Sequence, residues 1–167
     1  METTISIRKI NTQDVRIIHD LAKQIWPKAF ETILSKKQIS YMMNLMYSMD
    51  ALQKDAARGV EFYVLNFNGN DCGYAAIENI NNETYKLHKI YLSQKLHGKG
   101  LGKYLLQQVE AIVKNYGAGV VQLNVNRNNS AVNFYKSQGY AIIKQEDIDI
   151  GMSYFMNDYV MAKNLIG

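Results

Sequence analysis

The sequence contains few of the residues that covalent or metal-based stabilisation requires. Its 167 residues include one cysteine, Cys72, and one proline, Pro27. A single cysteine excludes an internal disulfide and a cysteine-rich zinc site. Cys72 lies between Asp71 and Gly73, where a turn is expected to lead into a strand. We therefore expect a structural role for Cys72 and not that of a nucleophile.

Long hydrophobic runs and a strong net charge are also absent. No apolar run approaches the roughly 18 residues that cross a bilayer. Residues 1–10 alternate between apolar and polar types, which favours a first strand over a signal peptide. The formal net charge of +4 indicates a mild preference for anionic ligands without implying nucleic acid. We expect a soluble, cytoplasmic protein with no membrane and no nucleic-acid partner.

Hydrophobic residues make up 47% of the chain, without a repeat, a linker or a long polar tract. This composition predicts one domain spanning residues 1–167. Apolar periodicity predicts helices over about 11–26, 37–49, 101–117 and 128–137, the first ended by Pro27. Strands are predicted at about 1–10, 60–66, 73–80, 84–92, 120–125, 140–147 and 155–163. The fold class is α+β (mixed α/β), with a parallel crossover between strands 84–92 and 120–125.

Three glycines precede the helix that is expected to begin at Leu101. Gly98, Gly100 and Gly102 remove the Cβ atoms that would keep a ligand from the backbone N–H groups. The first N–H groups of a helix have no partner within it, and the helix dipole favours anions there. Lys99 and Lys103 add positive charge. The segment is therefore predicted to bind phosphate, although a glycine loop without a ligand stays an alternative.

Two well-known phosphate-binding loops do not fit this segment. A Walker A loop has four residues between its glycines and then Lys-Ser/Thr, but Gly98 to Gly102 is one residue short and Tyr104 replaces the hydroxyl residue. A dinucleotide loop, Gly-x-Gly-x-x-Gly, would place its third glycine at Lys103. The loop therefore belongs neither to the Walker A class nor to the dinucleotide-binding class.

Residues 97–102 (HGKGLG), following Ile90-Tyr91-Leu92, resemble the Arg/Gln-x-x-Gly-x-Gly/Ala loop of the GNAT superfamily of acyl-CoA-dependent N-acetyltransferases. Residues 128–140 (NNSAVNFYKSQGY) are similar to that family's Asn-x-x-Ala-x-x-Phe-Tyr-x-x-x-Gly-Phe segment. The resemblance covers essentially the whole chain. It implies a GNAT fold, with a mostly antiparallel sheet of about seven strands, about four helices and a V-shaped splay between the fourth and fifth strands.

The resemblance further implies acetyl-CoA as cosubstrate, with no metal required. The pyrophosphate would rest on the loop amides and the pantetheine arm beside the preceding strand, while His97 departs from the usual Arg or Gln. The implied cofactor-binding residues are Ile90, Tyr91, Leu92, His97, Gly98, Lys99, Gly100, Leu101, Gly102, Lys103, Asn128 and Tyr135.

Proton transfers set the catalytic expectations. Tyr135 matches the family's tyrosine that protonates the departing thiolate, with a packed aromatic as the alternative. The attacking ammonium has a pKa near 10.4, so its deprotonation at pH 7 costs roughly 4 to 5 kcal/mol and needs a base or a water chain. Some relatives carry a glutamate where this chain has Lys86. The candidate bases are His88 and Glu78, ranked together, with Glu83 also near.

We expect direct transfer of an acetyl group to a primary amine in a ternary complex. A small amine, a polyamine, an amino acid or a protein amine would all be compatible acceptors. The alternative is a non-catalytic CoA-binding regulatory domain. The resemblance places the acceptor site at residues 26–49 and at a loop over 148–156, and it makes a homodimer possible. The candidate residues of the acceptor site are Trp26, Phe30, Tyr41, Tyr47, Tyr154 and Phe155, with Glu31, Asp147 and Asp149 able to attract a cation. Met42 and Met46 belong either to the core or to an adaptable surface.

Overall fold

The computed structural model describes residues 2–165. In that range it contains seven strands and five α-helices, one helix more than expected. The strands are β1 (Ile5–Lys9), β2 (Glu61–Phe67), β3 (Asn70–Asn81), β4 (Thr84–Leu92), β5 (Val120–Asn126), β6 (Ala141–Gly151) and β7 (Tyr154–Asn164). The helices are α1 (Arg16–Phe30), α2 (Lys36–Tyr47), α3 (Met49–Arg58), α4 (Leu101–Asn115) and α5 (Ala131–Ser137).

All seven strands join one sheet in the order β1-β2-β3-β4-β5-β7-β6. Only β4 and β5 are parallel, because α4 crosses over between them, and every other pair is antiparallel. The predicted mixed, mostly antiparallel sheet is therefore confirmed. None of the helices within residues 2–165 is long and apolar enough to span a membrane.

The sheet opens between its two parallel strands. Pairing of β4 with β5 covers only Thr84–Leu87 and Val120–Leu123, although both strands continue beyond it. On the other side of β4, Leu87 pairs with Ile77 and Lys89 with Ala76, so His88 is an extra residue in a β-bulge. A bulge increases the local twist of a strand. The V-shaped splay implied by the resemblance is present at the point where the bulge turns β4.

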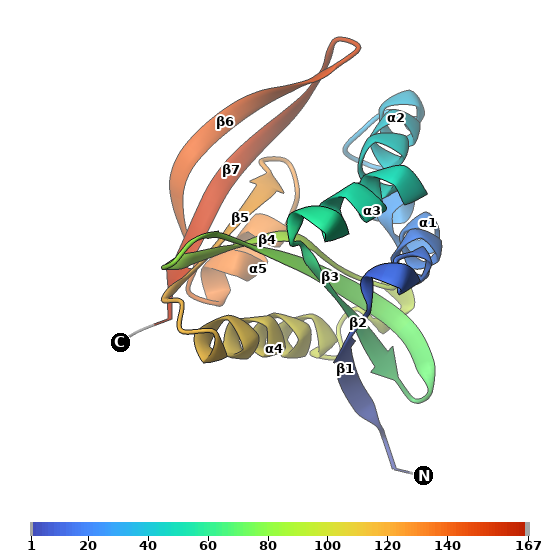
Figure 1. The fold of residues 1–167 in the computed structure, drawn as a ribbon. Helices are drawn as coiled ribbons and strands as arrows, with labels where there is room; N and C mark the ends of the chain where they lie inside the picture. The colour runs from blue at the N-terminus through green and yellow to red at the C-terminus, as the bar shows by residue number, and fades with distance from the viewer. Residues whose placement is uncertain (1, 166–167) are drawn as a thin grey trace.

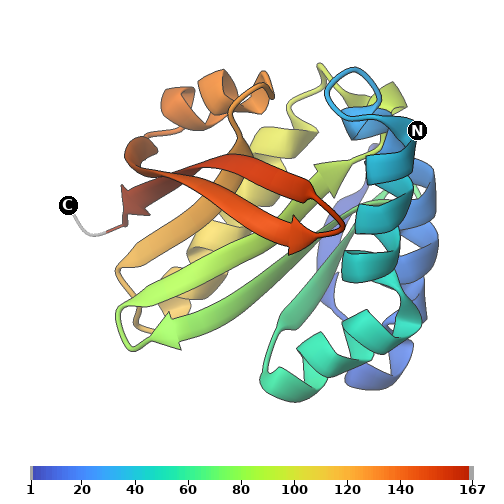
Figure 2. The same ribbon diagram turned by 90° about the horizontal axis from the view of Figure 1, so that it is seen from above.

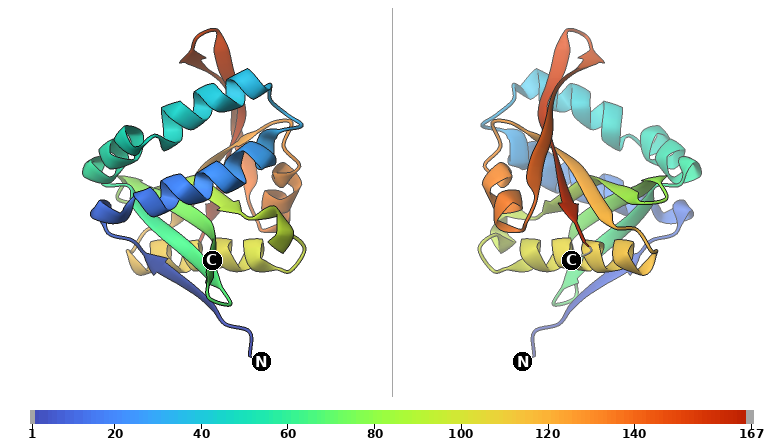
Figure 3. Two further views of the ribbon diagram at one scale, coloured as in Figure 1. Left: turned by 90° about the vertical axis from the view of Figure 1, so that its right-hand side faces the viewer. Right: turned by 90° about the vertical axis from the view of Figure 1, so that its left-hand side faces the viewer.

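Each face of the sheet carries its own core. Helices α4 and α5 cover one face, where Leu105, Leu106 and Val109 are fully buried. Helices α1, α2 and α3 cover the other, around Trp26 and Tyr74. Figure 3 shows α1 and α2 on the side of the sheet opposite α4. The splay between β4 and β5 is thus reached from the side of α1 to α3 and from the N-terminal end of α4.

The first helix continues past its proline. Pro27 lies inside α1, which ends at Phe30, so the prediction that Pro27 ends the helix is wrong. Proline lacks an N–H donor and costs about 3 kcal/mol in a helix interior. The continued turn buries Phe30, whose ring stacks on that of Trp26 at 4.5 Å. Burying a side chain of this size contributes about 1.5–3 kcal/mol, which offsets the loss.

The helix predicted over 37–49 is two helices. Ser48 is extended, with ψ 155°, and ends α2, while its hydroxyl accepts a hydrogen bond from the Ala51 N–H at the start of α3. Helix α3 then runs until Gly59, which adopts φ +113°. Helix α3 was not predicted, because the methionine periodicity was extended across Ser48. Residues 49–58 are nevertheless rich in strong helix formers.

The last two strands are longer than predicted and leave no loop over 148–156. They form a hairpin that turns at Met152 and Ser153, both with positive φ. Figure 2 shows the hairpin crossing the molecule toward α2. The Tyr41 hydroxyl donates to the Ile150 carbonyl at 2.5 Å, and Gln38 donates to the Phe155 carbonyl at 3.1 Å. These bonds attach the hairpin to α2.

Candidate active site

One large cleft, with a volume of about 1580 Å³, follows the splay. It begins at the N-terminal end of α4, passes between the open ends of β4 and β5, and reaches the inner side of α1, α2 and α3. Its wall is formed by segments that lie far apart in the sequence. The splay therefore brings the predicted phosphate loop and the predicted acceptor helices to one continuous space.

The start of α4 leaves its backbone N–H groups uncapped. Gly100 is its N-cap with φ +77°, no side chain caps it, and Gly98 has φ +82°. Both conformations favour glycine. Gly102 is in ordinary helical geometry, and a Cβ there would have no heavy atom within 4 Å. The first N–H groups of the helix are therefore open to a ligand, with Lys103 on the wall of the cleft.

Most residues of the predicted cofactor site line the cleft. These are Ile90, Tyr91, Leu92, His97, Gly98, Gly100, Gly102, Lys103, Asn128 and Tyr135. Lys99 is not on the wall, and the Leu101 side chain is buried in the core, so Leu101 can offer only its backbone. His97 Nε2 lies 3.1 Å from the Leu92 carbonyl oxygen. One ring nitrogen of His97 is therefore hydrogen-bonded to the backbone.

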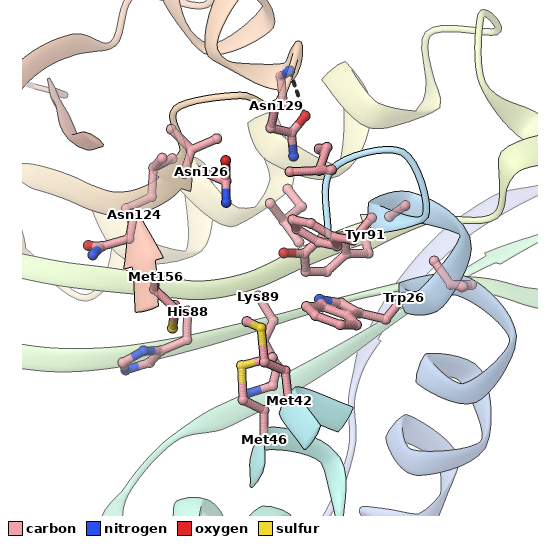
Figure 4. Close-up of a pocket in the computed structure, with 18 of the residues that line it drawn as sticks. Trp26, Met42, Met46, His88, Lys89, Tyr91, Asn124, Asn126, Asn129 and Met156 are labelled. Carbon is pink, nitrogen blue, oxygen red and sulfur yellow. Dashed lines mark hydrogen bonds between the residues drawn. The ribbon is translucent and has the colours of Figure 1, made fainter. Parts of the chain in front are cut away.

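An aromatic cluster forms the wall on the side of α1. Trp26 and Tyr91 both line this wall, and burial raises the pKa of Tyr91 to about 12. Behind them, the Tyr74 and Tyr47 hydroxyls are 2.9 Å apart. Figure 4 shows Trp26 and Tyr91 side by side, with Met42 and Met46 next to them and Asn126 across the cleft. Tyr74 was missed because a tyrosine within a strand carries no functional signal.

Tyr135 is placed in the cleft by α5. Its side chain is buried between the rings of Phe134 and Tyr140, with ring centres at 5.5 and 5.8 Å. Burial raises the pKa of the hydroxyl above its ordinary value. No hydrogen-bond partner of this hydroxyl is found among residues 2–165. Tyr135 thus keeps its proton and can donate it to a group in the cleft.

The two candidate bases form one hydrogen-bonded unit. His88 Nε2 and Glu78 Oε1 are 2.8 Å apart, and Arg58 of α3 holds both Glu78 oxygens at 3.0 and 3.2 Å. The Arg58 guanidinium lowers the pKa of Glu78, and burial lowers the pKa of His88. An ionised carboxylate only accepts hydrogen bonds, so Nε2 carries the proton and Nδ1 is left as an acceptor. His88 lines the cleft and Glu78 does not.

Lys89, next to His88, was not expected to matter. Only 8% of this residue is exposed, and its Nζ lies 3.8 Å from Asp55 and 5.0 Å from the centre of the Tyr47 ring. Burial lowers the pKa of its ammonium group. Because α3 supplies Asp55, this pairing could not be foreseen without that helix.

The wall on the side of β5 and β7 contains a buried carboxylate. Asp158 of β7 is 3% exposed and accepts a hydrogen bond from Asn124 Nδ2 at 3.2 Å. Asn124 Oδ1 is buried and has no partner within residues 2–165. Both residues line the cleft. Sequence analysis missed them, because one polar residue in an alternating strand is usually solvent-facing.

The predicted acceptor residues divide into two groups. Trp26, Phe30, Tyr47, Phe155 and Glu31 line the cleft. Tyr41 and Tyr154 instead contact each other at 5.3 Å, Asp147 pairs with Arg127, and Asp149 accepts from the Gly151 N–H. None of these four lines the described cleft. The two tyrosines and the two aspartates contact the β6–β7 hairpin or residues next to it, so the cleft does not bring them to the acceptor position expected for them.

No group of three or more His, Cys, Asp or Glu side chains in residues 2–165 is arranged to hold a metal ion. Cys72 is buried and its thiol lies 3.6 Å from the Leu65 carbonyl. Burial raises its pKa. These contacts give Cys72 the packing environment of a structural cysteine.

Known acetyltransferases resemble this chain over almost its whole length. A spermidine N(1)-acetyltransferase from Thermoplasma acidophilum is 28% identical over 166 residues, which cover 96% of this chain and 97% of that protein. The crystal structure of PaiA N-acetyltransferase from the same organism, in complex with coenzyme A, has a TM-score of 0.79 at 26% identity and covers 96% of this chain and 99% of that one.

A third protein shares the fold alone. The ribosomal-protein-S18-alanine N-acetyltransferase of Escherichia coli has a TM-score of 0.74 at 16% identity, over 98% of this chain and 96% of that one. The family model described as "Acetyltransferase (GNAT) domain" matches residues 22–157. The chain therefore belongs to the GNAT family of acetyltransferases, as the two sequence motifs indicated.

Proposed function

We propose that this protein transfers an acetyl group from acetyl-CoA to a primary amine of a small polyamine, by direct attack in a ternary complex. The observation that carries this proposal is the single cleft that joins the open N-terminus of α4 to His88. The relative named as a spermidine N(1)-acetyltransferase supports the acceptor class. The structure of PaiA with coenzyme A supports the cosubstrate.

The pyrophosphate of acetyl-CoA would bind the N–H groups at the start of α4. Gly98 and Gly100 give the loop its shape, and Gly102 leaves the space that a Cβ would fill. A helix N-terminus favours an anion by roughly 0.3–1 kcal/mol, and by about 2 kcal/mol when partly buried. The pantetheine arm would follow the open edge of β4 at Ile90 to Leu92, and Asn128 would contact the coenzyme from the other side.

His88 would take the proton of the attacking amine. Nδ1 is the ring nitrogen left as an acceptor, because Nε2 donates to Glu78. The lowered pKa of His88 keeps the imidazole neutral at pH 7. Glu78 orients the ring and is itself unsuited as the base, since Arg58 stabilises its ionised form. Of the two candidates, the geometry favours His88.

Tyr135 would complete the reaction as general acid. The amine nitrogen forms a bond to the thioester carbonyl carbon, the C–S bond of the resulting tetrahedral species breaks, and the thiolate takes the Tyr135 proton. Water in the cleft then returns a proton to Tyr135 and takes the proton held by His88. A thiol has a pKa of about 8.5, so the thiolate leaves tolerably well without help. We therefore expect Tyr135 to contribute less to the rate acceleration than His88.

The test is a rate assay with purified protein, acetyl-CoA and a panel of spermidine, 1,4-diaminobutane, amino acids and peptides with a free amine, following release of free thiol. We expect turnover with the polyamines to exceed turnover with the amino acids and peptides. If acetyl-CoA binds and no amine is acetylated, the protein is the non-catalytic CoA-binding domain. If amino acids or peptides are preferred, the acceptor class proposed here is wrong.

A further inference from the structure

Asp158 occupies an unusual position for a charged residue. It is 3% exposed, yet its strand register aligns it with Asn126 on β5 and Glu146 on β6. Its side chain lies on the wall of the cleft. A carboxylate hidden from bulk water on a cleft wall is costly unless a cation or several donors satisfy it.

The described residues satisfy Asp158 only in part. Its one hydrogen bond comes from Asn124 Nδ2 at 3.2 Å, and within residues 2–165 no cationic side chain lies within 4.0 Å of it. Burial raises the pKa of Asp158, and Lys86 and Arg127, which lie farther away, lower it only in part. Glu146, 3.5 Å from the same Asn124 nitrogen, adds negative charge. The Oδ1 atom of Asn124 is buried without a partner. Asn124 thus leaves an acceptor atom open beside a carboxylate that has a single donor. The other buried side-chain atom without a partner within residues 2–165 is Nη1 of Arg127, whose guanidinium is already paired with Asp147.

The missing donor is best matched by an alkylammonium group. An ammonium carries three N–H donors and one positive charge, which suits a carboxylate and one amide oxygen. A Ca²⁺ or Mg²⁺ ion would need about six or more oxygen ligands, and these two side chains offer too few. The apolar wall formed by Met42, Met46 and Met156 on the way to this point suits the methylene chain that would carry the ammonium.

We propose that Asp158 and Asn124 bind a second ammonium group of the acceptor, one that is not acetylated. This inference rests on the proposed function and names the residues that would make the site prefer an acceptor with two or more cationic groups over a monoamine. The reacting amine would lie between His88 and the thioester, beside Tyr91. Figure 4 shows the Asn124 amide turned away from Trp26 and Tyr91, so the second ammonium would bind on the β6–β7 side of the cleft.

The kinetic test compares 1,4-diaminobutane with n-butylamine, which lacks the second ammonium. We expect the wild-type protein to have a KM at least about tenfold lower for the diamine, since hydrogen bonds to charged groups are the strong ones. Asp158→Asn should raise the diamine KM by about 10- to 100-fold and leave the butylamine KM and both kcat values within about threefold. Asp20→Asn, an exposed carboxylate on α1 outside the cleft, is the charge-matched control and should change nothing.

A second measurement separates a binding role from a structural one. Asp158→Asn removes a buried charge and keeps an oxygen that can accept from Asn124 Nδ2, so the melting temperature of the free protein should stay equal or rise. A role in holding the sheet together would lower it. Asn124→Ala removes the other half of the subsite and should raise the diamine KM by about three- to tenfold.

Three results overturn the inference: no diamine preference in the wild type, an unchanged preference in Asp158→Asn, or a clearly lower melting temperature of that variant. If no amine is acetylated, the proposed function fails by itself. The subsite is then tested by calorimetric titration of 1,4-diaminobutane into the CoA-loaded protein. Tighter binding by wild type than by Asp158→Asn supports the subsite, and equal or absent binding overturns it.

Discussion

His88 is the residue whose loss should change the pH dependence of the reaction. Its pKa is lowered from 6.5, chiefly by burial, so the wild-type rate should fall on the acidic side only below pH 6.5, where the imidazole becomes protonated. His88→Gln should reduce kcat by about 10²- to 10⁴-fold, the range of general acid–base catalysis, and remove this acidic limb. Steady-state rates from pH 5 to 9 with saturating acetyl-CoA measure both effects.

Glu78→Gln is the matched test of the positioning role. It keeps an acceptor for His88 Nε2–H but removes the negative charge that raises the imidazole pKa. The acidic limb should then move to still lower pH, with a smaller loss of kcat than for His88→Gln. A His88→Gln protein that retains the wild-type acidic limb would remove the histidine from the mechanism.

Tyr135→Phe should have a modest effect. The hydroxyl stays protonated at all working pH values because burial raises its pKa, but the thiolate is already a fair leaving group. We expect kcat to fall by less than about 10²-fold, with the affinity for acetyl-CoA nearly unchanged because the ring is kept. An unchanged kcat in folded protein would show that Tyr135 serves only in packing.

At the residue scale, the sequence showed which side chains can titrate but not which partners they contact. His88 and Glu78 could be named as titratable residues on neighbouring strands. That they share one hydrogen bond depends on the bulge that makes His88 an extra residue in β4. Arg58, Lys89 and Asp158 escaped notice, because what distinguishes them is burial and a partner distant in the sequence.

The turn into α4 offers a matched pair of variants. Gly100→Ala would place a Cβ at φ +77°, a strain of roughly 1–2 kcal/mol, and should lower both stability and CoA affinity. Gly102→Ala has helical geometry and open space around the new Cβ, so stability should be kept or slightly raised while CoA affinity falls. Thermal unfolding of the free protein and calorimetric titration with CoA distinguish the two. Unchanged CoA affinity in Gly102→Ala would move the phosphate site elsewhere.

Ser48 should matter for stability out of proportion to its size. Its hydroxyl accepts the Ala51 N–H, and its extended backbone separates α2 from α3. Ser48→Ala should cost about 1 kcal/mol, the usual value of a helix N-cap, as measured by urea unfolding. Ser40→Ala, exposed within α2, is the control and should be neutral or slightly stabilising. Equal effects of the two changes would contradict the capping role.

Elements with strong local signals were predicted well from the sequence. The predictions of the glycine turns, the alternating strands and helix α4 agree with the structure. In these elements the residues that produce the sequence pattern are also the residues that pack in the core. Pro27 and the last hairpin were predicted wrongly for tertiary reasons. Burial of Phe30 outweighs the proline penalty, and contacts with α2 extend β6 and β7 beyond their own sequence signals.

The pH dependence of folding is a property of the whole molecule. The pKa of His88 is 6.5 in the unfolded chain and lower in the folded protein. Between the two pKa values the unfolded chain binds more protons than the folded protein. Folding stability therefore rises with pH up to about 6.5, and this contribution is lost as the pH falls. Glu78 and Asp71 have lowered pKa values. Their contributions to folding stability are fully present above pH 4.5 for Glu78 and above pH 3.8 for Asp71, and they are lost at lower pH.

We therefore expect the urea midpoint to decrease from pH 7 to pH 5 and to decrease further below pH 4.5. His88→Gln should flatten the first part of this curve and leave the second in place. A wild-type midpoint that stays constant between pH 7 and 5 would contradict the burial of the imidazole. Far-ultraviolet circular dichroism at each pH gives the measurement.

Association of two copies and a cytoplasmic location stay predictions. Strand β6 is an edge strand with exposed Ile142 and Ile143, and an unprotected edge of this kind is rarely left open in a monomer. Light scattering of the purified protein decides the oligomeric state.

The open seam between β4 and β5 has a consequence beyond catalysis. Backbone groups that a central sheet would ordinarily pair are left to water beyond Leu87 and Leu123, so a molecule that fills the seam binds only the folded state. Such a ligand at one hundred times its dissociation constant adds about 2.7 kcal/mol to folding stability. The amount of this protein that survives heat or proteolysis should therefore report the acetyl-CoA supply of its surroundings.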